Sequence, residues 1–225
     1  MLADRIIFLD GEAIVVDKPA GLPVDRPRDG SLSVENHLDS LRFGFQRWPQ
    51  PAHRLDRDTS GCLLLARNPK ALVRFNQAFA EGQVEKIYIA VVAGVPDADD
   101  GLIDMALAKT STRESGWRMV GDPKGKPART HWRKLAVANG RALIRFAPET
   151  GRTHQLRVHA ATGLDLPIFG DPVYGVSGAH GMMLHAYSLT VPRAGKAPIT
   201  ATAPLPERFA ALGFADPVDA TDAAA

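Results

Sequence analysis

An aspartate between two arginines is the feature of this sequence best suited to covalent chemistry. Asp56 stands between Arg54 and Arg57 in the segment HRLDRDTSG, residues 53–61, and the apolar run 62–66 follows directly. An ionised aspartate can attack a sugar carbon and form an ester intermediate, and a neighbouring guanidinium favours the charged carboxylate. From this segment alone, a surface ion pair between Asp56 and one of these arginines is the simpler interpretation.

Other kinds of catalytic site fit the sequence poorly. His154 and His159 are five residues apart, which puts them on diverging faces of a helix, and no carboxylate lies nearby as a third ligand, so we expect no metal site. Cys62 opens an apolar run and is expected to pack rather than to react. A pair of glycosidase carboxylates is not expected either, since Asp58 and Asp56 are only two apart and need not converge on one bond.

Two further segments carry side chains suited to RNA. KIYIAVVAG, residues 86–94, places Tyr88 on an expected strand, where it could equally be a core tyrosine. ETGRTHQLRVHAA, residues 149–161, contains many hydrogen-bond donors and few apolar residues. Such donors suit phosphate oxygens, ribose hydroxyls and base edges. They are Arg152, Thr153, His154, Gln155, Arg157 and His159.

The charge of the chain is unevenly distributed. The net charge is only +2, but residues 40–74 hold seven Lys and Arg against two acidic residues, and residues 105–157 hold twelve against three. Two basic segments on a nearly neutral protein indicate a surface shaped for a polyanion. The alternative is that dispersed arginines only solvate helices and strands.

The expected elements indicate an α+β fold, because strands arrive in antiparallel pairs with few helices between them. Residues 96–125 are polar, with weak periodicity, and predict long loops or an irregular hairpin. Other segments have clear signals from proline, Asn-Gly or Asp-Gly turns, capping residues and apolar spacing. We predict a hairpin at 6–17, helices at 33–41, 70–79 and 153–161, a strand pair at 130–137 and 141–146, and strands at 62–66, 86–93 and 182–191.

Taken together, these motifs make the chain resemble the RluA family of pseudouridine synthases. H-R-L-D-x-x-T-S-G is intact at 53–61, K-x-Y at 86–88 and G-R-T-H-Q-L-R-V-H at 151–159, with GDPVYG and LHAYSLTVP following in family order. The resemblance covers residues 6 to 205. It implies an α+β catalytic domain with a mostly antiparallel central sheet and flanking helices. An N-terminal S4-type RNA-binding domain does not fit before the first hairpin, so we expect the short, single-domain branch.

The resemblance also implies roles for particular residues. Asp56 would drive cleavage of the uridine N-glycosidic bond, and Arg157 would pair with it and keep it ionised. Tyr88 would stack on the target base and take part in deprotonation at C5. Arg54 would occupy the space left by the departing uridine, although it could instead be a second ion-pair partner of Asp56. The expected RNA-binding residues are Arg54, Arg57, Lys86, Arg152, His154 and Gln155.

The predicted function is therefore isomerisation of specific uridines in tRNA, in 23S rRNA or in both. The reaction needs no cofactor and no metal, because the uracil is only detached, turned and reattached. We expect structured RNA as the partner, no membrane association, a monomer and a cytoplasmic location, to which the single cysteine also points. The alternatives are a catalytically inactive RNA-binding paralogue and a nucleic-acid glycosylase. We expect the catalytic domain to span residues 1–209 and an acidic, Ala-rich frayed tail to span 210–225.

Overall fold

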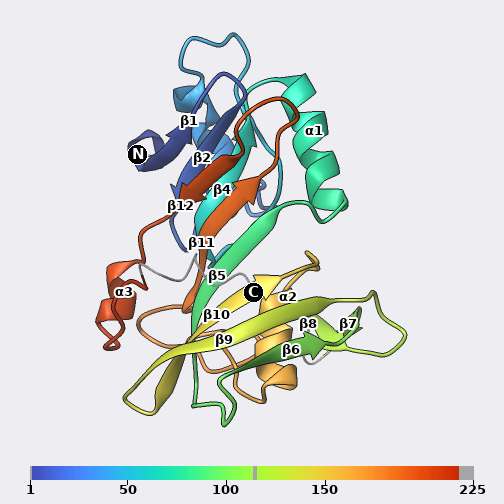
Figure 1. Ribbon diagram of the computed structural model, residues 1–225, viewed down its shortest axis with the longest axis vertical. Helices are drawn as coiled ribbons and strands as arrows, with labels where there is room; N and C mark the ends of the chain where they lie inside the picture. The colour runs from blue at the N-terminus through green and yellow to red at the C-terminus, as the bar shows by residue number, and fades with distance from the viewer. Residues whose placement is uncertain (1, 114–115, 218–225) are drawn as a thin grey trace. The chain divides into compact units, whose positions relative to one another are not determined.

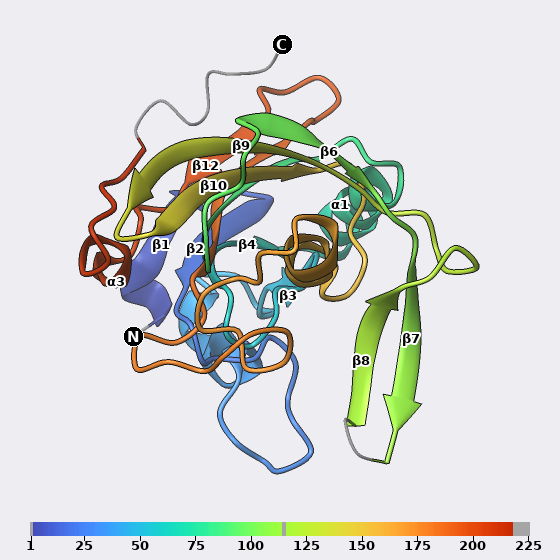
Figure 2. The same cartoon turned by 90° about the horizontal axis from the view of Figure 1, so that it is seen from below.

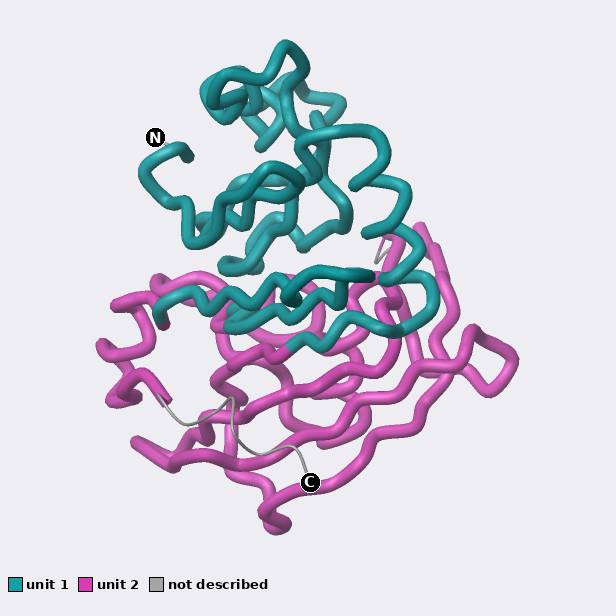
Figure 3. Tube along the Cα trace, turned by 45° about the horizontal axis from the view of Figure 1, so that its top comes forward, with its two compact units in different colours: residues 1–86, 185–204 teal, residues 87–184, 205–225 magenta. Residues whose placement is uncertain are grey.

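The chain divides into two compact units. A computed structural model describes residues 2–113 and 116–217. Unit 1 consists of residues 1–86 and 185–204, and unit 2 consists of residues 87–184 and 205–225 (Figure 3). The sequence predicted one catalytic domain, and no linker-like composition marks the places where the chain passes from one unit to the other.

Unit 1 is built around two fully buried strands. Strand β2 is buried along its whole length and pairs antiparallel with β4, which is buried along its whole length as well. Strand β11 pairs in parallel with β4, so the sheet of unit 1 is mixed, although mostly antiparallel (Figure 1). The order is β1-β2-β4-β11, with β3 also on β4 and β12 on β11. The bounds are β1 Ile6–Leu9, β2 Ala13–Lys18, β3 Gln50–Pro51, β4 Ser60–Ala66, β11 Leu184–Val191 and β12 Ile199–Thr202.

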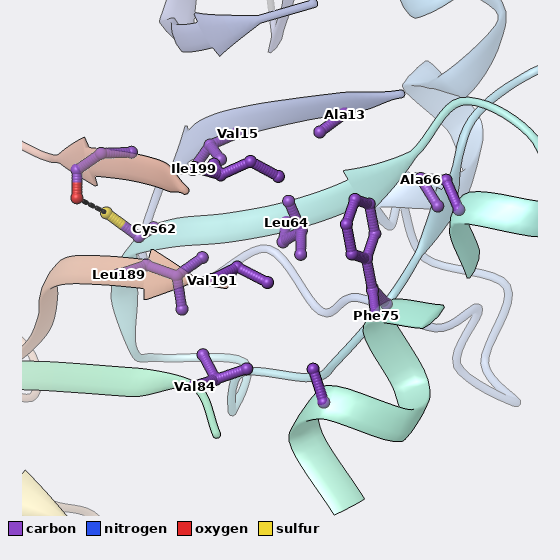
Figure 4. Packing of buried hydrophobic residues seen from close by; sticks show 14 of the residues in the cluster. Ala13, Val15, Cys62, Leu64, Ala66, Phe75, Val84, Leu189, Val191 and Ile199 are labelled. Carbon is purple, nitrogen blue, oxygen red and sulfur yellow. Dashed lines mark hydrogen bonds between the residues drawn. The ribbon is translucent and has the colours of Figure 1, made fainter. Parts of the chain in front are cut away.

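A helix covers one face of this sheet and closes an apolar core. Helix α1, Pro69–Ala80, begins where the sequence predicted, because the Asn68 side chain accepts a hydrogen bond from the Ala71 amide (2.9 Å) and Pro69 suits the first helical turn. Phe75 of α1 lies beside Leu64 in a cluster of buried residues that also includes Leu189 (Figure 4). The segment predicted as a helix at 33–41 is a 3-10 helix, η2, Val34–Leu41, capped by Ser33, and the short 3-10 helix η1 is Leu2–Arg5.

Unit 2 contains an antiparallel sheet and a separate hairpin. Strands β5, β10, β9 and β6 pair in that order, and β7 pairs with β8 in a two-stranded sheet. The hairpin of β7 and β8 projects away from β6, β9 and β10 (Figure 2). The predicted Asn-Gly turn between β9 and β10 is confirmed, since both residues have positive φ, 51° for Asn139 and 70° for Gly140. The bounds are β5 Glu85–Val92, β6 Asp100–Asp104, β7 Leu107–Thr112, β8 Gly116–Gly121, β9 Arg129–Ala138 and β10 Arg141–Pro148.

Two predicted segments differ from the structure. The described residues of 96–125 were predicted as long loops or an irregular hairpin; they include the hairpin of β7 and β8 and also a strand, β6, that adds to β9. The helix predicted at 153–161 begins two residues later, as α2, Gln155–Val158, since His154 has a φ of 53°, and it continues as a π-helix, η3, His159–Gly163. Helix α3 is Glu207–Ala210.

The C-terminal boundary also needs correction. Leu212 and Phe214 are buried, with 7% and 2% of their surface exposed, so the packed chain extends beyond the predicted end of the domain at residue 209. The rest of the predicted tail, residues 218–225, lies outside the described residues. Over the described part of the chain, no helix has the length and apolar character needed to cross a membrane.

Candidate active site

The predicted catalytic aspartate lies in a loop that is anchored by two buried residues. Residues 53–59, here called the motif loop, lead into β4, and Leu55 and Thr59 are 7% and 2% exposed. The Thr59 amide donates to the backbone oxygen of Asp56 (3.2 Å), which closes a turn. The Asp56 side chain itself is half-buried. The loop therefore fixes its own backbone while leaving the carboxylate partly accessible.

A buried lysine holds the main chain of the motif loop. Lys18, the last residue of β2, is fully buried, and its ammonium donates to the backbone oxygens of Pro19 (3.0 Å), Leu22 (2.7 Å) and Arg57 (3.0 Å). A buried charge needs such partners, because leaving it unsatisfied is costly. Lys18 thus anchors the residue that directly follows Asp56. The sequence analysis did not single out Lys18 for this role.

The other end of the motif loop is anchored by a buried histidine. Ser60 Oγ lies 2.9 Å from His185 Nδ1, and His185 Nε2 lies 3.2 Å from the backbone oxygen of Ala203. A carbonyl can only accept, so Nε2 carries the proton, and Nδ1 accepts from the serine hydroxyl. Gly61 follows with a φ of 107°, and a Cβ there would lie 2.2 Å from the Ala186 oxygen. Only glycine permits this approach of β4 to β11.

His53, at the start of the motif loop, acts as an acceptor. Its ring stacks on Phe79 with 4.6 Å between centroids, and Nε2 accepts from the Leu64 amide (3.0 Å). Burial, with a smaller contribution from the positive charge of Lys86, lowers the pKa of His53 to about 4. The ring is therefore neutral near pH 7, as the hydrogen bond from Leu64 requires.

The two arginines beside Asp56 both extend toward solvent. Arg54 is 78% exposed in its side chain and forms an ion pair with Asp25 (3.0 Å). Arg57 is exposed, and its Nε donates to the Gly21 oxygen (3.3 Å). Both are accessible to a polyanion.

In unit 2, the structure reveals a buried partner of Arg157 that the sequence did not single out. Asp171 is fully buried, and its two carboxylate oxygens accept from Arg157 Nε (2.7 Å) and Nη2 (2.8 Å). Burial alone would raise the pKa of Asp171, but the hydrogen bonds and charge of Arg157, with the amides of Val173 and Tyr174, lower it below its usual range. Asp171 belongs to the segment GDPVYG, which supported the family resemblance by its position after the other motifs. Its role as the partner of Arg157 became evident only from their contact in the structure.

His154 belongs to an aromatic cluster next to α2. Its ring stacks on Trp117 of β8 with 5.1 Å between centroids, and Nδ1 lies 2.9 Å from the Tyr174 hydroxyl. Lys109 of β7 lies over the Trp117 ring, 5.3 Å from its centroid. Half of the Trp117 surface is exposed. The cluster combines a positive charge with an exposed aromatic face, which suits contact with RNA.

Two predicted RNA contacts beside Arg157 differ in accessibility. Gln155 is 4% exposed; its oxygen accepts from the Arg152 amide (2.9 Å), and its nitrogen donates to the Arg129 oxygen (3.0 Å) and to Thr130 Oγ1 (3.0 Å). The prediction that Gln155 contacts RNA is therefore corrected, because its side-chain amide forms hydrogen bonds within the protein instead. Arg152 is exposed, and its Nε donates to the Pro127 oxygen (3.0 Å).

The remaining predicted site residues lie on β5. Tyr88 is half-buried and stands opposite Phe146 of β10. Lys86 is also half-buried, and burial lowers its pKa. The predicted site residues are thus distributed over both units: Arg54, Asp56, Arg57 and Lys86 belong to unit 1, and Tyr88, Arg152, His154, Gln155 and Arg157 belong to unit 2.

Cys62 is a packing residue, as predicted. It is buried in the core of unit 1 (Figure 4), and its thiol lies 3.4 Å from the backbone oxygen of Tyr187. Burial raises the pKa of the Cys62 thiol to about 12, so the reactive thiolate is not populated near pH 7. Among the residues that the structure describes, no group of three or more His, Cys, Asp or Glu side chains could hold a metal ion.

Comparison with known proteins identifies the class to which this fold and these motifs belong. Residues 12–162 match the RNA pseudouridylate synthase family. An uncharacterized RNA pseudouridine synthase of Zymomonas mobilis is 61% identical over 217 residues, covering 95% of this chain and 99% of that protein. Ribosomal large subunit pseudouridine synthase D of Nitrosomonas europaea is 35% identical, covering 92% of this chain and 64% of that protein. The solved structure of human RNA pseudouridylate synthase domain containing 4 superposes with a TM-score of 0.77 at 27% identity, over 93% of this chain and 91% of that one.

The chain therefore belongs to the RNA pseudouridylate synthase family, and the resemblance to the RluA family is confirmed. It is an RNA pseudouridine synthase, an isomerase that acts on RNA.

Proposed function

We propose that this enzyme converts specific uridines of structured RNA to pseudouridine, in transfer RNA, in large-subunit ribosomal RNA or in both. We also propose that Asp56 is its catalytic carboxylate. The observation that carries the proposal is the partly accessible carboxylate of Asp56 on a loop whose backbone is fixed by Lys18, Thr59 and Ser60. Relatives named for the ribosomal large subunit favour ribosomal RNA as one substrate.

The isomerisation needs one bond broken and one bond made. The bond between uracil N1 and ribose C1′ breaks, a bond between C5 and C1′ forms, the proton leaves C5 and N1 gains one. Asp56 drives the cleavage, as an ionised carboxylate can at a sugar carbon. Tyr88 stacks on the base and takes part in removing the C5 proton. Atoms balance without an added reagent, so the mass of the RNA is unchanged.

Arginines complete the proposed machinery. Arg157 supplies the positive charge that favours ionised Asp56, and Asp171 fixes the orientation of the Arg157 guanidinium by its two hydrogen bonds. The target uridine must leave the base stack, at a cost of a few kcal/mol. Arg54, whose exposed side chain is long and planar at its end, fills the space that the uridine leaves. Arg57, Lys86, Arg152 and His154 contact the RNA around the target.

The test compares Asp56→Asn with Asp58→Asn on total RNA from a strain that lacks the enzyme. We expect Asp56→Asn to abolish pseudouridine formation while RNA affinity falls little, because the phosphate contacts remain. Asp58→Asn makes the same chemical change two residues away and should keep most of the wild-type rate.

Two measurements would overturn the proposal. An Asp56→Asn enzyme with a tenth or more of the wild-type rate would place the catalytic carboxylate elsewhere. A loss of RNA mass in the wild-type reaction would mean that base is released, as in a glycosylase. Mapping the modified uridines in the same RNA identifies the substrate.

The enzyme is further proposed to act as a monomer in the cytoplasm. The buried thiol of Cys62 suits a reducing compartment. Light scattering coupled to size-exclusion chromatography tests the first point, and fluorescence imaging of the tagged full chain tests the second.

A further inference from the structure

Three aromatic side chains stand exposed within one short segment of unit 1. Phe43, Phe45 and Trp48 keep 46%, 36% and 54% of their surface accessible. They lie between η2 and β3, in residues 42–49, which the catalytic motifs do not include. Clustered exposed aromatics of this kind mark an interaction site, whereas exposed apolar side chains that are scattered singly are normal on a protein surface.

The same segment carries arginines. Arg42 lies over the Trp48 ring, 5.4 Å from its centroid, and forms an ion pair with Asp39, whereas Arg47 is exposed. A hollow of about 350 Å³ is lined by three arginines and by no acidic residue: Arg42, Gln46, Arg47, Trp48, Gln50, Ala66, Arg67, Asn68 and Pro69. Its size is within the range of small-ligand pockets. Its charge calls for an anionic occupant.

A buried arginine holds this segment in shape. Arg67, 7% exposed, donates to the backbone oxygens of Arg42 (3.0 Å) and Phe43 (3.1 Å), and its guanidinium lies 3.9 Å from the centroid of the Phe45 ring. Phe43 has a φ of 44°, an unfavourable conformation for a bulky residue. The fold thus stabilises a strained turn that presents Phe43 to solvent, and such strain is concentrated at functional sites.

We propose that Arg42, Phe43, Phe45, Arg47 and Trp48, the arginine–aromatic surface, bind an unpaired nucleotide of the RNA substrate. A base stacks on the Trp48 indole while Arg47 contacts its phosphates. An unpaired nucleotide fits better than a duplex, because base pairs hide the faces that an aromatic ring can cover. RNA fits better than a protein partner, because the hollow has cationic side chains and no acidic one.

The surface lies at a distance from the Asp56 end of the motif loop. It borders Ala66, at one end of β4, whereas Arg57, next to Asp56, is bound by Lys18, which pairs with Gly61 near the other end. A strand rises about 3.3 Å per residue, so these ends are roughly 20 Å apart. The nucleotide bound here is therefore not the target uridine but one several positions away. This inference rests on the proposed RNA substrate and extends it.

The first test uses RNA that cannot be modified. A fluorescein-labelled adenylate oligomer of about 15 nucleotides is within the length range that single-strand sites cover and contains no uridine. Trp48→Ala should raise its Kd about 10-fold, because base–aromatic stacking is lost, and Trp48→Phe should restore most of the affinity. Arg47→Ala should raise Kd several-fold and reduce the slope of log Kd against log salt by about 0.7.

Matched variants separate this surface from general effects. Val73→Ala removes another exposed apolar side chain of unit 1, and Arg28→Ala removes an exposed arginine that lies outside both basic segments. Both should leave Kd within twofold of wild type. With an RNA that wild-type enzyme modifies, Trp48→Ala should raise KM and leave kcat unchanged.

Unchanged Kd in both Trp48→Ala and Arg47→Ala, or an equal loss in Arg28→Ala, would overturn the inference. Because adenylate binding needs no turnover, these outcomes are independent of whether Asp56 is the catalytic residue. Failure of the wild-type enzyme to modify transfer or ribosomal RNA would contradict the proposed function alone.

Discussion

In the described part of the chain, each buried charged side chain has hydrogen-bond partners. The ammonium of Lys18 donates to three carbonyls, and the guanidinium of Arg157 forms a two-pronged pair with Asp171. Each buried charge stabilises a particular geometry, because removing one partner leaves the other unsatisfied at a cost of several kcal/mol. In both places the geometry supports a proposed catalytic feature, the motif loop or Arg157.

Asp171→Asn should lower the free energy of unfolding by roughly 3–5 kcal/mol, because Arg157 would keep its charge in a buried position without a carboxylate. Urea denaturation at pH 7 measures the change. Asp165→Asn is the matched control: Asp165 is exposed with a φ of 56°, which asparagine tolerates well. It should change stability by less than about 0.5 kcal/mol. Equal effects of the two substitutions would argue against the ion pair as a determinant of stability.

His53 predicts a loss of stability on mild acidification. Its pKa is about 4 in the folded protein, below the ordinary histidine value of 6.5, so on acidification the unfolded chain binds a proton first. The stabilisation is complete above pH 6.5 and is lost as the pH falls toward 4, by up to about 3 kcal/mol. Asp171 titrates below its usual value of 3.8, outside this interval.

Unfolding free energies of wild type and His53→Gln between pH 7 and 4 test this prediction. Glutamine can still accept from the Leu64 amide but does not titrate, so the variant should lose less stability with acid. His180→Gln, at an exposed position, should behave like wild type. Parallel curves for His53→Gln and wild type would contradict the assignment.

At the scale of elements, β4 connects the apolar core of unit 1 to the motif loop that carries Asp56. Its side chains pack on α1 and on β11, and the motif loop enters it at Ser60. The position of Asp56 therefore depends on how closely β4 can approach its neighbours. Gly61 is the residue that sets this distance.

Gly61→Ala should be strongly destabilising, because its Cβ would overlap the Ala186 backbone at 2.2 Å and its φ of 107° is unfavourable for alanine. We expect a loss of more than about 3 kcal/mol, the upper range for overpacking. Gly11→Ala is the matched control, with no atom within 4 Å of the added Cβ. Thermal denaturation of both variants provides the measurement, and similar melting temperatures would show that β4 and β11 can separate without cost.

At the scale of the whole molecule, charge is distributed so that each unit carries one basic segment. Residues 40–74 belong to unit 1 and residues 105–157 to unit 2, although the net charge of the chain is only +2. RNA affinity should therefore depend on ionic contacts from both units rather than on net charge.

Binding of substrate RNA should weaken steeply with salt. If several phosphates are contacted, Kd should rise on the order of 10²–10³-fold between 50 and 200 mM salt. Asp56→Asn should have the same salt slope as wild type, since Asp56 contacts no phosphate in the proposed mechanism. Fluorescence anisotropy titrations at four salt concentrations measure both slopes. A flat salt dependence would contradict binding through the basic segments.

Local signals in the sequence determined much of the fold. The cap at Asn68, the Asn-Gly turn at 139–140 and the continuous apolar run in β4 each act between near neighbours, so each can be interpreted without the rest of the chain. The long motifs likewise sufficed to identify the family. The roles of Asp56, Tyr88 and Arg157 stay predictions that came from those motifs.

The tertiary structure decided which polar side chains are buried, and against what. Lys18 is bound by the carbonyl of Arg57, 39 residues away, and Arg157 by Asp171, 14 residues away. The Gln155 amide has the donor and acceptor groups that an RNA contact needs, yet it is buried and forms its hydrogen bonds inside unit 2. Hydrogen bonds and ion pairs of this kind depend on which atoms the fold brings within about 3 Å, and a distance between residues far apart in sequence is not encoded in either residue's type or its local spacing.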